Sequence, residues 1–148
     1  MVVSPDVRIE RLGPRDRERA RRTFELLTEV FKTPGEPLSD GYVRRLLDRP
    51  EFWVLAAIVG DEIVGGLTAH ELPTTRNEST ELFIYDVAVH PAFQRRGIGR
   101  QLMTTLLALA AKRGIDVTFV PADNEDDHAL AFYEALGGVA APVTMFDF

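Results

Sequence analysis

The segment from Glu81 to Gly114 constrains the fold of this chain more than any other stretch. It begins with a strand-like run, Glu81–Val89, passes through a loop with two glycines, and continues with apolar residues at helical spacing over residues 97–113. Gly114 stands where a left-handed glycine ends a helix. The inward residues of this helix are predicted to be Leu102, Met103, Leu106, Leu107, Leu109 and Ala110. A strand joined directly to a helix is typical of an α/β protein.

Further strand-like runs and helices precede this unit. Phe52–Val59 and Ile63–Glu71 are largely apolar and are separated by only three residues, which predicts an antiparallel hairpin. Upstream, Val7–Leu12 alternates between apolar and polar residues, which predicts a strand. A first helix is predicted to begin at Gly13-Pro14, and a second is capped by Ser39 and stops before Pro50. The inward residues of the first helix are predicted to be Ala20, Phe24, Leu27, Val30 and Phe31.

The C-terminal third completes the predicted fold. Asp116–Val120 is predicted to be a short strand, and one residue of the pair Asp126-Asp127 can cap a helix that Gly137 ends. Val143–Phe148 is predicted to be a last strand. Because no repeat or long linker divides the chain, we expect a single domain over residues 1–148, an α/β fold with a mixed, mostly antiparallel central sheet flanked by helices.

The composition excludes several kinds of site. Cysteine is absent, which removes disulfides, thiolate metal ligands and a covalent acyl-thiol route together. The three histidines, His70, His90 and His128, share no metal-ligand spacing, so we expect no metal site. No apolar run approaches the roughly 18 residues that cross a bilayer, and the first ten residues lack the apolar core of a signal peptide. We therefore expect a cytoplasmic protein with no membrane partner.

Charge is distributed unevenly along the chain. Residues 1–50 contain 11 basic and 9 acidic side chains, whereas residues 51–148 contain 6 basic and 14 acidic ones. After Arg113 there are seven acidic side chains and no basic one. Such a half does not suit the phosphate backbone of a nucleic acid, so nucleic-acid binding is not expected. It is either a solvated acidic face or a surface that attracts a cationic ligand.

The two glycines before the long helix coincide with a cluster of positive charge. Four of the six basic residues in the second half lie within Arg95–Lys112. The first N–H groups of that helix have no intrahelical acceptor, and the helix dipole adds partial positive charge there, so a pyrophosphate fits the site. Two glycines can also form only a tight turn. A phosphate-binding Gly-Lys-Ser/Thr sequence and the third glycine of the dinucleotide fingerprint are both missing.

The segment Val87–Gly99, with a strand before it and a helix after it, resembles the acetyl-CoA signature of the GNAT acetyltransferase superfamily. That signature consists of a strand, a His/Pro loop and the pattern Gln/Arg-x-x-Gly-x-Gly/Ala, which residues 94–99 match. The resemblance implies the GNAT fold, acetyl-CoA as the acetyl donor, and an oxyanion hole of main-chain N–H groups near Val87–Val89. The residues that it implies for cofactor binding are Val87, Ala88, Val89, Gln94, Arg95, Arg96, Gly97, Ile98, Gly99, Arg100 and Gln101.

A second segment, Ala129–Gly137, resembles the C-terminal helix of the same superfamily. Tyr133 falls at the tyrosine that commonly protonates the leaving CoA thiolate, which implies that it is the general acid. Without the signature upstream, Tyr133 would more simply be a half-buried helix residue with a hydrated hydroxyl group. The chain departs from the family at two points, because Asp126 stands where many members have asparagine and Gly138 replaces an aromatic residue.

Several shorter matches are similar to the aminoglycoside 3-N-acetyltransferase branch, which confers antibiotic resistance. They are Ser39–Tyr42 with Leu46-Leu47, Ile84–Val89, Phe119–Asp123, Asp126-Asp127 and Phe146–Phe148. This similarity implies an acetyl-CoA-dependent N-acetyltransferase that modifies the 3-amino group of an aminoglycoside. The alternatives are an acetyltransferase for another small polyamine or for a protein or peptide amine, and a non-catalytic acyl-CoA sensor.

The amine must lose a proton during transfer, so a carboxylate is expected to act as the base. Without cysteine, the remaining scheme is direct attack in a ternary complex. Asp123, which follows a predicted strand, is the first choice for the base and Glu81 the second. Each has a simpler reading as a loop or strand-end carboxylate. Strand alternation predicts that Asp86 points away from Tyr85, which favours a structural role for it.

The expected partner is a cationic small-molecule amine. Asp126 and Asp127 are predicted to cap a helix and, with Asp123, to contact this substrate. We leave open whether the chain forms a homodimer.

Overall fold

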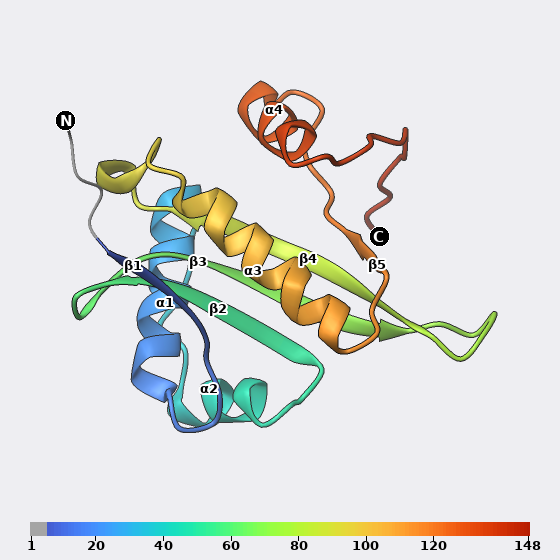
Figure 1. The fold of residues 1–148 in the computed structure, drawn as a ribbon. Coiled ribbons are helices and arrows are strands. Elements are labelled where there is room, and N and C mark those ends of the chain that lie inside the picture. The colour runs from blue at the N-terminus through green and yellow to red at the C-terminus, as the bar shows by residue number, and fades with distance from the viewer. Residues whose placement is uncertain (1–5) are drawn as a thin grey trace.

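The computed structural model describes residues 6–148 and contains a five-stranded sheet with the strand order β1-β2-β3-β4-β5 (Figure 1). The strands are β1 (Val7–Arg11), β2 (Phe52–Val59), β3 (Glu62–Pro73), β4 (Thr80–Val89) and β5 (Val117–Phe119). The first four pair antiparallel with their neighbours, and β5 joins β4 in parallel. The predicted α/β class with a mixed, mostly antiparallel sheet is confirmed.

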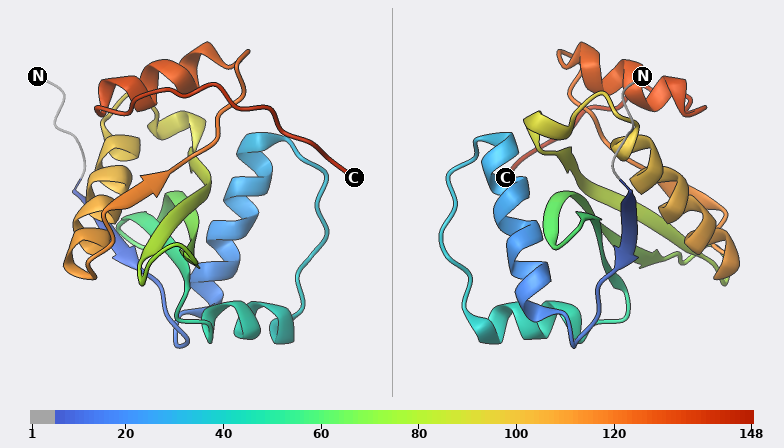
Figure 2. Two further views of the ribbon diagram at one scale, coloured as in Figure 1. Left: turned by 90° about the vertical axis from the view of Figure 1, so that its right-hand side faces the viewer. Right: turned by 60° about the vertical axis from the view of Figure 1, so that its left-hand side comes forward.

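Helices cover both faces of the sheet (Figure 2). α1 (Arg17–Phe31) and α2 (Asp40–Leu47) lie on one face, and α3 (Ile98–Lys112) lies on the other. A single 3₁₀ turn, Pro91–Phe93, connects β4 to α3. The last helix, α4 (Asp127–Ala135), stands beside the first turn of α3 rather than on the sheet (Figure 1).

Each face of the sheet has its own apolar core. On the α3 face the buried side chains include Trp53, Leu55, Leu67, Leu82, Ile84, Leu102 and Leu106. On the other face they include Ala20, Leu26, Val43, Leu47, Val54, Ala56 and Ile58. Because β2 contributes to both cores, its sequence is a continuous apolar run instead of an alternating one.

α1 packs closely on the sheet at Gly66 of β3. A Cβ atom on Gly66 would lie 2.4 Å from Thr23 Cγ2 and 3.0 Å from the carbonyl oxygen of Leu55. Thr23 is fully buried, and its hydroxyl donates to the carbonyl oxygen of Arg19 at 2.8 Å. The missing side chain at Gly66 therefore allows α1 to pack this close to β3.

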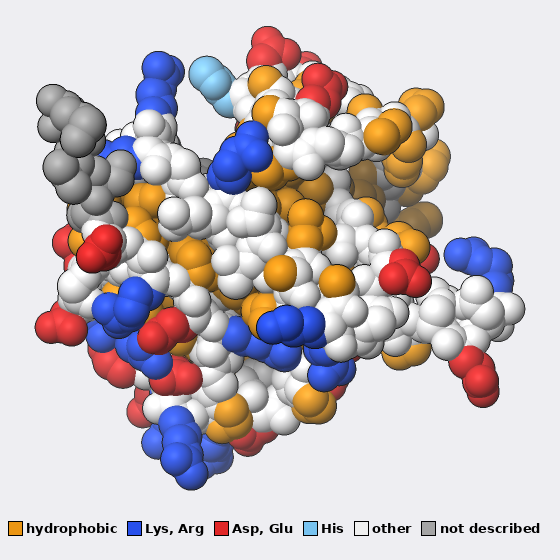
Figure 3. Space-filling model, viewed as in Figure 1, with side chains coloured by type: hydrophobic (Ala, Val, Ile, Leu, Met, Phe, Trp, Pro, Cys, Tyr) orange, Lys and Arg blue, Asp and Glu red, His pale blue; other side chains and the backbone are white. Residues whose placement is uncertain are grey.

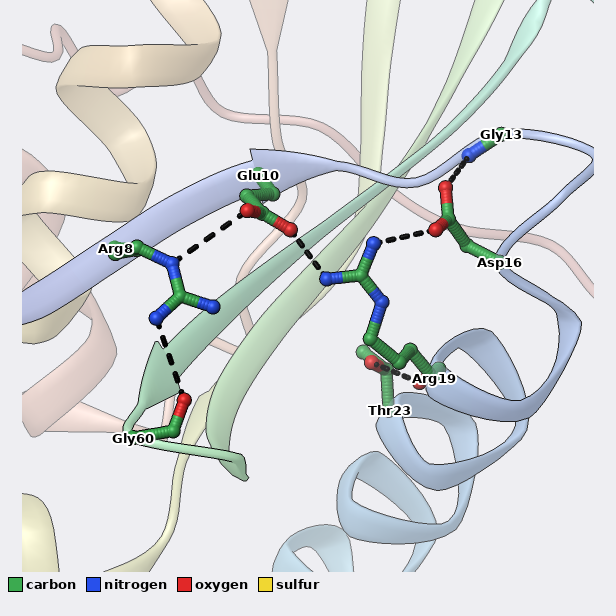
Figure 4. A network of polar contacts seen from close by, with 7 residues as sticks. All are labelled: Arg8, Glu10, Gly13, Asp16, Arg19, Thr23 and Gly60. Atoms are coloured by element: carbon green, nitrogen blue, oxygen red, sulfur yellow. Dashed lines mark hydrogen bonds and ion pairs between the residues drawn. The ribbon is translucent and has the colours of Figure 1, made fainter.

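A polar network joins β1 to the beginning of α1 (Figure 4). Arg19 donates to the carboxylates of Glu10 and Asp16, and Asp16 accepts the N–H of Gly13 at 2.8 Å. Burial alone would raise the pKa of Asp16, but the Gly13 N–H and the Arg19 guanidinium outweigh it and lower the pKa. Because residues 13–16 form this turn, the helix begins at Arg17 and not at the predicted Gly13-Pro14.

Most other predicted boundaries are confirmed within two residues. Ser39 caps α2 by accepting the N–H of Tyr42 at 3.1 Å, and Gly114 follows α3 with a left-handed φ of 75°. Two residues predicted to point inward are exposed, Phe31 by 48% and Leu107 by 40%. Phe31 is the last residue of α1, and Leu107 lies beside the buried stripe of α3.

The predicted strand Val143–Phe148 is wrong. The sheet ends at β5, and residues 138–148 run without regular structure and without a strand partner. A strand needs a neighbour to satisfy its backbone groups, and alternation in one segment cannot supply that neighbour. The large apolar side chains of this segment are exposed, and they gather beside α4 in Figure 3; they include Val143, Met145, Phe146 and Phe148.

Gly66→Ala should destabilise the protein, because its new Cβ atom would overlap Thr23 and the Leu55 carbonyl. We expect a loss of about 1–3 kcal/mol in the free energy of unfolding, measured by urea denaturation. Gly13→Ala is the control, since nothing lies within 4 Å of a Cβ there. Adding Thr23→Ser removes the clashing methyl group and should restore part of the loss. Equal stability of the two alanine variants would contradict this account.

Candidate active site

The sheet opens between β4 and β5. β5 pairs with β4 only at residues 81–83, whereas β3 follows β4 as far as Val89. Within residues 6–148, the β5 side of β4 therefore has no strand partner beyond Phe83. At this opening, the backbone groups on one edge of β4 are not paired with another strand of residues 6–148.

Two backbone donors of β4 point into the opening. The N–H of His90 donates to Val64 of β3 at 2.8 Å. Because backbone groups of successive strand residues point to opposite edges, the N–H of Ala88 also faces β3, and those of Val87 and Val89 face the open side. The predicted oxyanion donors are thus reduced from three to two.

A bulge in β4 changes the direction of Asp86. Ala69 of β3 faces Ile84 and Thr68 faces Asp86, so Tyr85 has no partner and alternation is interrupted. Asp86 therefore shares a face of the sheet with Tyr85, which corrects the expectation that the two point apart.

Asp86 is a half-buried carboxylate, and burial raises its pKa. It forms no ion pair or hydrogen bond with any residue that the structure describes, so it lacks the partners of a structural carboxylate. The sequence contained no signal for this position, because the bulge depends on the pairing of β4 with β3.

The turn before α3 has a backbone suited to an anion. Gly97 has a left-handed φ of 81°, and a Cβ there would meet nothing within 4 Å. Arg95 is also left-handed, with a φ of 64°. Turns of this kind direct backbone N–H groups into a concave surface. The first N–H of α3 to find an intrahelical acceptor is that of Gln101, which donates to Gly97 at 3.0 Å, so the N–H groups of residues 98–100 remain available.

Some side chains of the predicted cofactor segment make contacts within the protein, and others are free to contact a ligand. Gln94 donates to the carbonyl oxygen of Val89 at 2.9 Å, which fixes the loop to the end of β4. Ile98 is buried in the α3 core, so only its backbone can contact a ligand. The guanidinium of Arg96 lies 5.3 Å from the centre of the Phe93 ring. Arg95 is exposed and has no protein partner among the described residues.

Gly99 serves packing more than ligand approach. A Cβ on Gly99 would lie 3.2 Å from two ring atoms of Phe132 in α4. Arg100 donates to the carbonyl oxygen of Ala135 at 3.4 Å, so α3 and α4 are joined at a second point. These contacts bring Tyr133, the residue after Phe132, to the same end of the molecule as the glycine turn.

Tyr133 is half-buried on α4, and its pKa is raised. Burial is the largest cause, and the negative charges of Asp126 and Asp86 add to it. Its hydroxyl therefore keeps its proton at neutral pH. The charge of Asp86 therefore acts on Tyr133 although 47 residues separate the two in the chain.

An acidic hollow of about 500 Å³ lies at the start of α4; its lining residues are Asp123, Glu125, Asp126, Asp127 and His128. Figure 3 shows acidic side chains over this part of the surface. Asp126 caps α4 by accepting the N–H of Ala129 at 3.0 Å, and Asp123 accepts the N–H of Glu125 at 2.9 Å. Both therefore have local roles, and both still present carboxylate oxygens to the hollow.

Glu81 does not join this group. It lies at the start of β4, paired with Val117, and five residues of strand separate it from Asp86 by about 16 Å. Neither Asp123 nor Glu81, the two predicted candidates for the base, contributes to the raised pKa of Tyr133, whereas Asp86, which was expected to be structural, does.

The described part of the chain contains neither a group of metal ligands nor a membrane-spanning helix. Among residues 6–148, no three His, Asp or Glu side chains are grouped so that they could hold a metal ion. None of the helices in the same range is long and apolar enough to cross a membrane.

Comparison with known proteins gives consistent matches. The family model described as the acetyltransferase (GNAT) family matches residues 19–138. N-alpha-acetyltransferase RimI of Mycobacterium tuberculosis is 32% identical over 126 residues, which are 85% of this chain and 76% of that protein.

Two solved structures are also similar. An aminoglycoside acetyltransferase from an uncultured soil metagenomic sample is 38% identical, with a TM-score of 0.91 and 97% of each chain covered. A second aminoglycoside acetyltransferase from an uncultured soil metagenomic sample, in complex with sisomicin, is 31% identical, with a TM-score of 0.92. The match covers 96% of this chain and 95% of that one.

Asp126→Asn should lower the pKa of Tyr133, because it removes one of the charges that disfavour the phenolate. Asparagine still caps a helix, so α4 is retained. The titration can be followed by NMR of protein labelled at the tyrosine ζ carbon. Asp123→Asn is the matched control and should leave the pKa unchanged. If the pKa of Tyr133 is the same in the wild type and in both variants, the charge of Asp126 does not act on Tyr133.

Proposed function

The chain belongs to the acetyltransferase (GNAT) family, and we propose that it transfers an acetyl group from acetyl-CoA to the 3-amino group of an aminoglycoside. Residues 1–148 would act together as one catalytic domain. The observation that carries the proposal is the acidic hollow at residues 123–128. Its Asp126 raises the pKa of Tyr133, and the same chain has an arginine-rich turn before α3.

The turn before α3 has the properties that the donor requires. Acetyl-CoA supplies an activated acetyl thioester and carries a pyrophosphate. The free N–H groups of residues 98–100 and the positive end of the α3 dipole suit the pyrophosphate. Gly97 leaves open space where any other residue would have a side chain, and Arg95 and Arg96 add positive charge.

The acceptor assignment rests on charge and on the relatives. Several carboxylates around one hollow suit a ligand with several ammonium groups, and Asp123, Asp126 and Asp127 would hold it by charge-assisted hydrogen bonds. Two structures at 31% and 38% identity are of aminoglycoside acetyltransferases. The choice of the 3-amino group is supported by the sequence motifs alone.

We assign the chemistry to three parts of the site. The N–H groups of Val87 and Val89 would stabilise the negative charge that develops on the carbonyl oxygen during attack. Asp86 would take the proton of the amine, because its raised pKa brings it nearer to neutral and no protein group competes for it. Tyr133 would give its proton to the departing sulfur atom. We prefer Asp86 to Asp123 and Glu81 as the base for these reasons.

A second candidate acceptor is the terminal amine of a peptide. The observation in its favour is the 32% identity to RimI of Mycobacterium tuberculosis, an N-alpha-acetyltransferase. The seven acidic residues after Arg113 would then bind a basic peptide.

Tyr133→Phe should lower kcat, because it keeps the ring and removes the proton donor. Loss of a general acid costs about 10²–10⁴-fold, and the KM for acetyl-CoA should change little. Steady-state kinetics with a thioester-release assay measure both. If chemistry limits turnover and kcat falls by less than about threefold, water or another group protonates the sulfur.

The acceptor is tested by comparing gentamicin, spermidine and an N-terminal alanine peptide at equal concentration. We expect kcat/KM to be highest for gentamicin, with NMR of the product placing the acetyl group on the 3-amino nitrogen. Higher efficiency with spermidine or the peptide would overturn the aminoglycoside assignment. An acetyl group elsewhere on gentamicin would overturn the regiochemistry only.

Asp123→Asn supplies a matched test of the hollow. It should raise the KM for gentamicin and leave the KM for acetyl-CoA unchanged. Asp116→Asn, an exposed aspartate of the same acidic region outside the hollow, should change neither value.

A further inference from the structure

Aromatic side chains form a row across four strands of the sheet. The register pairs Phe52 of β2 with His70 of β3, His70 with Phe83 of β4, and Phe83 with Phe119 of β5. Ring centres lie 5.2 Å apart for Phe52 and His70, and 5.2 Å apart for Phe83 and Phe119. Tyr85 extends the row, at 5.8 Å from Phe83 and 6.2 Å from His70.

This row is covered at one end and open at the other. Phe52 belongs to the core beneath α1 and α2, where Phe24 of α1 lies 6.2 Å from it. α1 packs on β2, β3 and β4, and α2 packs on β2. Tyr85 is 63% exposed and Phe119 40% exposed, while His70 and Phe83 are half-buried. The four rings of His70, Phe83, Tyr85 and Phe119 form the aromatic floor.

The aromatic floor adjoins both parts of the proposed acceptor site. Asp86 directly follows Tyr85 and shares its face of the sheet because of the bulge. Phe119 is followed after four residues by Asp123 of the acidic hollow, a chain length that spans at most about 14 Å. The floor is therefore followed directly in the chain by one carboxylate, Asp86, and Asp123 lies within about 14 Å of Phe119.

We propose that the aromatic floor binds one amino-sugar ring of the acceptor, with ring C–H groups and an ammonium group on the faces of Tyr85 and Phe119. A ligand cation over an aromatic face is attracted by the ring's π electrons, and a few polar groups beside an apolar surface fix its orientation. The inference rests on the proposed function, and it adds a binding surface that is separate from the acidic hollow.

The charge state of the floor agrees with a cationic ligand. Burial, and to a lesser extent the charge of Arg49, lowers the pKa of His70. The lowered pKa favours the neutral imidazole, which does not repel an ammonium group. Asp86, the residue after Tyr85 on the same face of the sheet, adds a carboxylate beside the floor.

The test compares Tyr85→Ala, Phe119→Ala and the double variant with a matched control. Tyr42→Ala removes an aromatic residue of 45% exposure from α2 whose ring is not one of the paired rings of the floor. We expect the KM for gentamicin to rise about two- to fivefold in each single variant and about tenfold in the double variant. The KM for acetyl-CoA should stay constant, and Tyr42→Ala should behave as the wild type. Tyr85→Phe, which keeps the ring, should retain most of the affinity.

A single-ring acceptor separates the floor from the catalytic centre. For 2-deoxystreptamine, which lacks the extra amino-sugar rings, the double variant should lose less than about threefold in kcat/KM. An unchanged KM for gentamicin in the double variant, or an equal loss for both acceptors, would overturn the aromatic floor while leaving the acetyltransferase assignment intact.

Two further outcomes would identify another occupant of the floor. A wild type that acetylates only the peptide would overturn both the proposed acceptor and this subsite. A change in sedimentation of the double variant, with no change in the KM for gentamicin, would identify the floor as a contact between two copies of the chain. Circular dichroism of each variant checks that the fold is retained.

Discussion

The limited pairing of β5 with β4 is the constraint on which the rest of the site depends. Three residue pairs anchor β5 to the sheet, and beyond Phe83 the edge of β4 is free. Free backbone donors inside a closed core would be costly, so this edge is tolerable only where water or a ligand reaches it. The bulge at Tyr85 lies in β4, and the chain from the end of this strand leads into the turn at Gly97. The opening thus leaves backbone N–H groups of β4 available as hydrogen-bond donors to a ligand.

The two charged regions of the site come from different levels of structure. The positive one is local, because a single turn supplies its glycine conformation, its free N–H groups and its arginines. The negative one combines the turn at residues 123–128 with Asp86 of β4, which only the folded sheet brings near Tyr133. A chain that carries a net charge of −6 can therefore present a cationic surface and an anionic one side by side.

Features with a local cause could be predicted from the sequence, and features that depend on distant pairing could not. The strand Phe52–Val59 is predicted by its apolar run, and the strand Val7–Arg11 by its alternation of apolar and polar residues. Gly114 marks the end of α3. The bulge that turns Asp86 toward the face of Tyr85 has no periodic signal. The C-terminal segment has the composition of a strand, but its neighbour is missing. Likewise, the sequence places Gly99 among the ligand contacts, because its packing partner Phe132 lies 33 residues later in the chain.

α4 carries Tyr133 although it is the most weakly anchored helix of the fold. None of its residues is fully buried, and Phe132 on Gly99 and the Arg100 bond to Ala135 connect it to α3. Segments with few buried contacts open at a lower free energy than the cores around them. Heating should therefore release α4 while the sheet and its two cores remain folded. With Tyr133 as the proposed general acid, the temperature of inactivation would then be set by the contact between α3 and α4, below the temperature at which the protein melts.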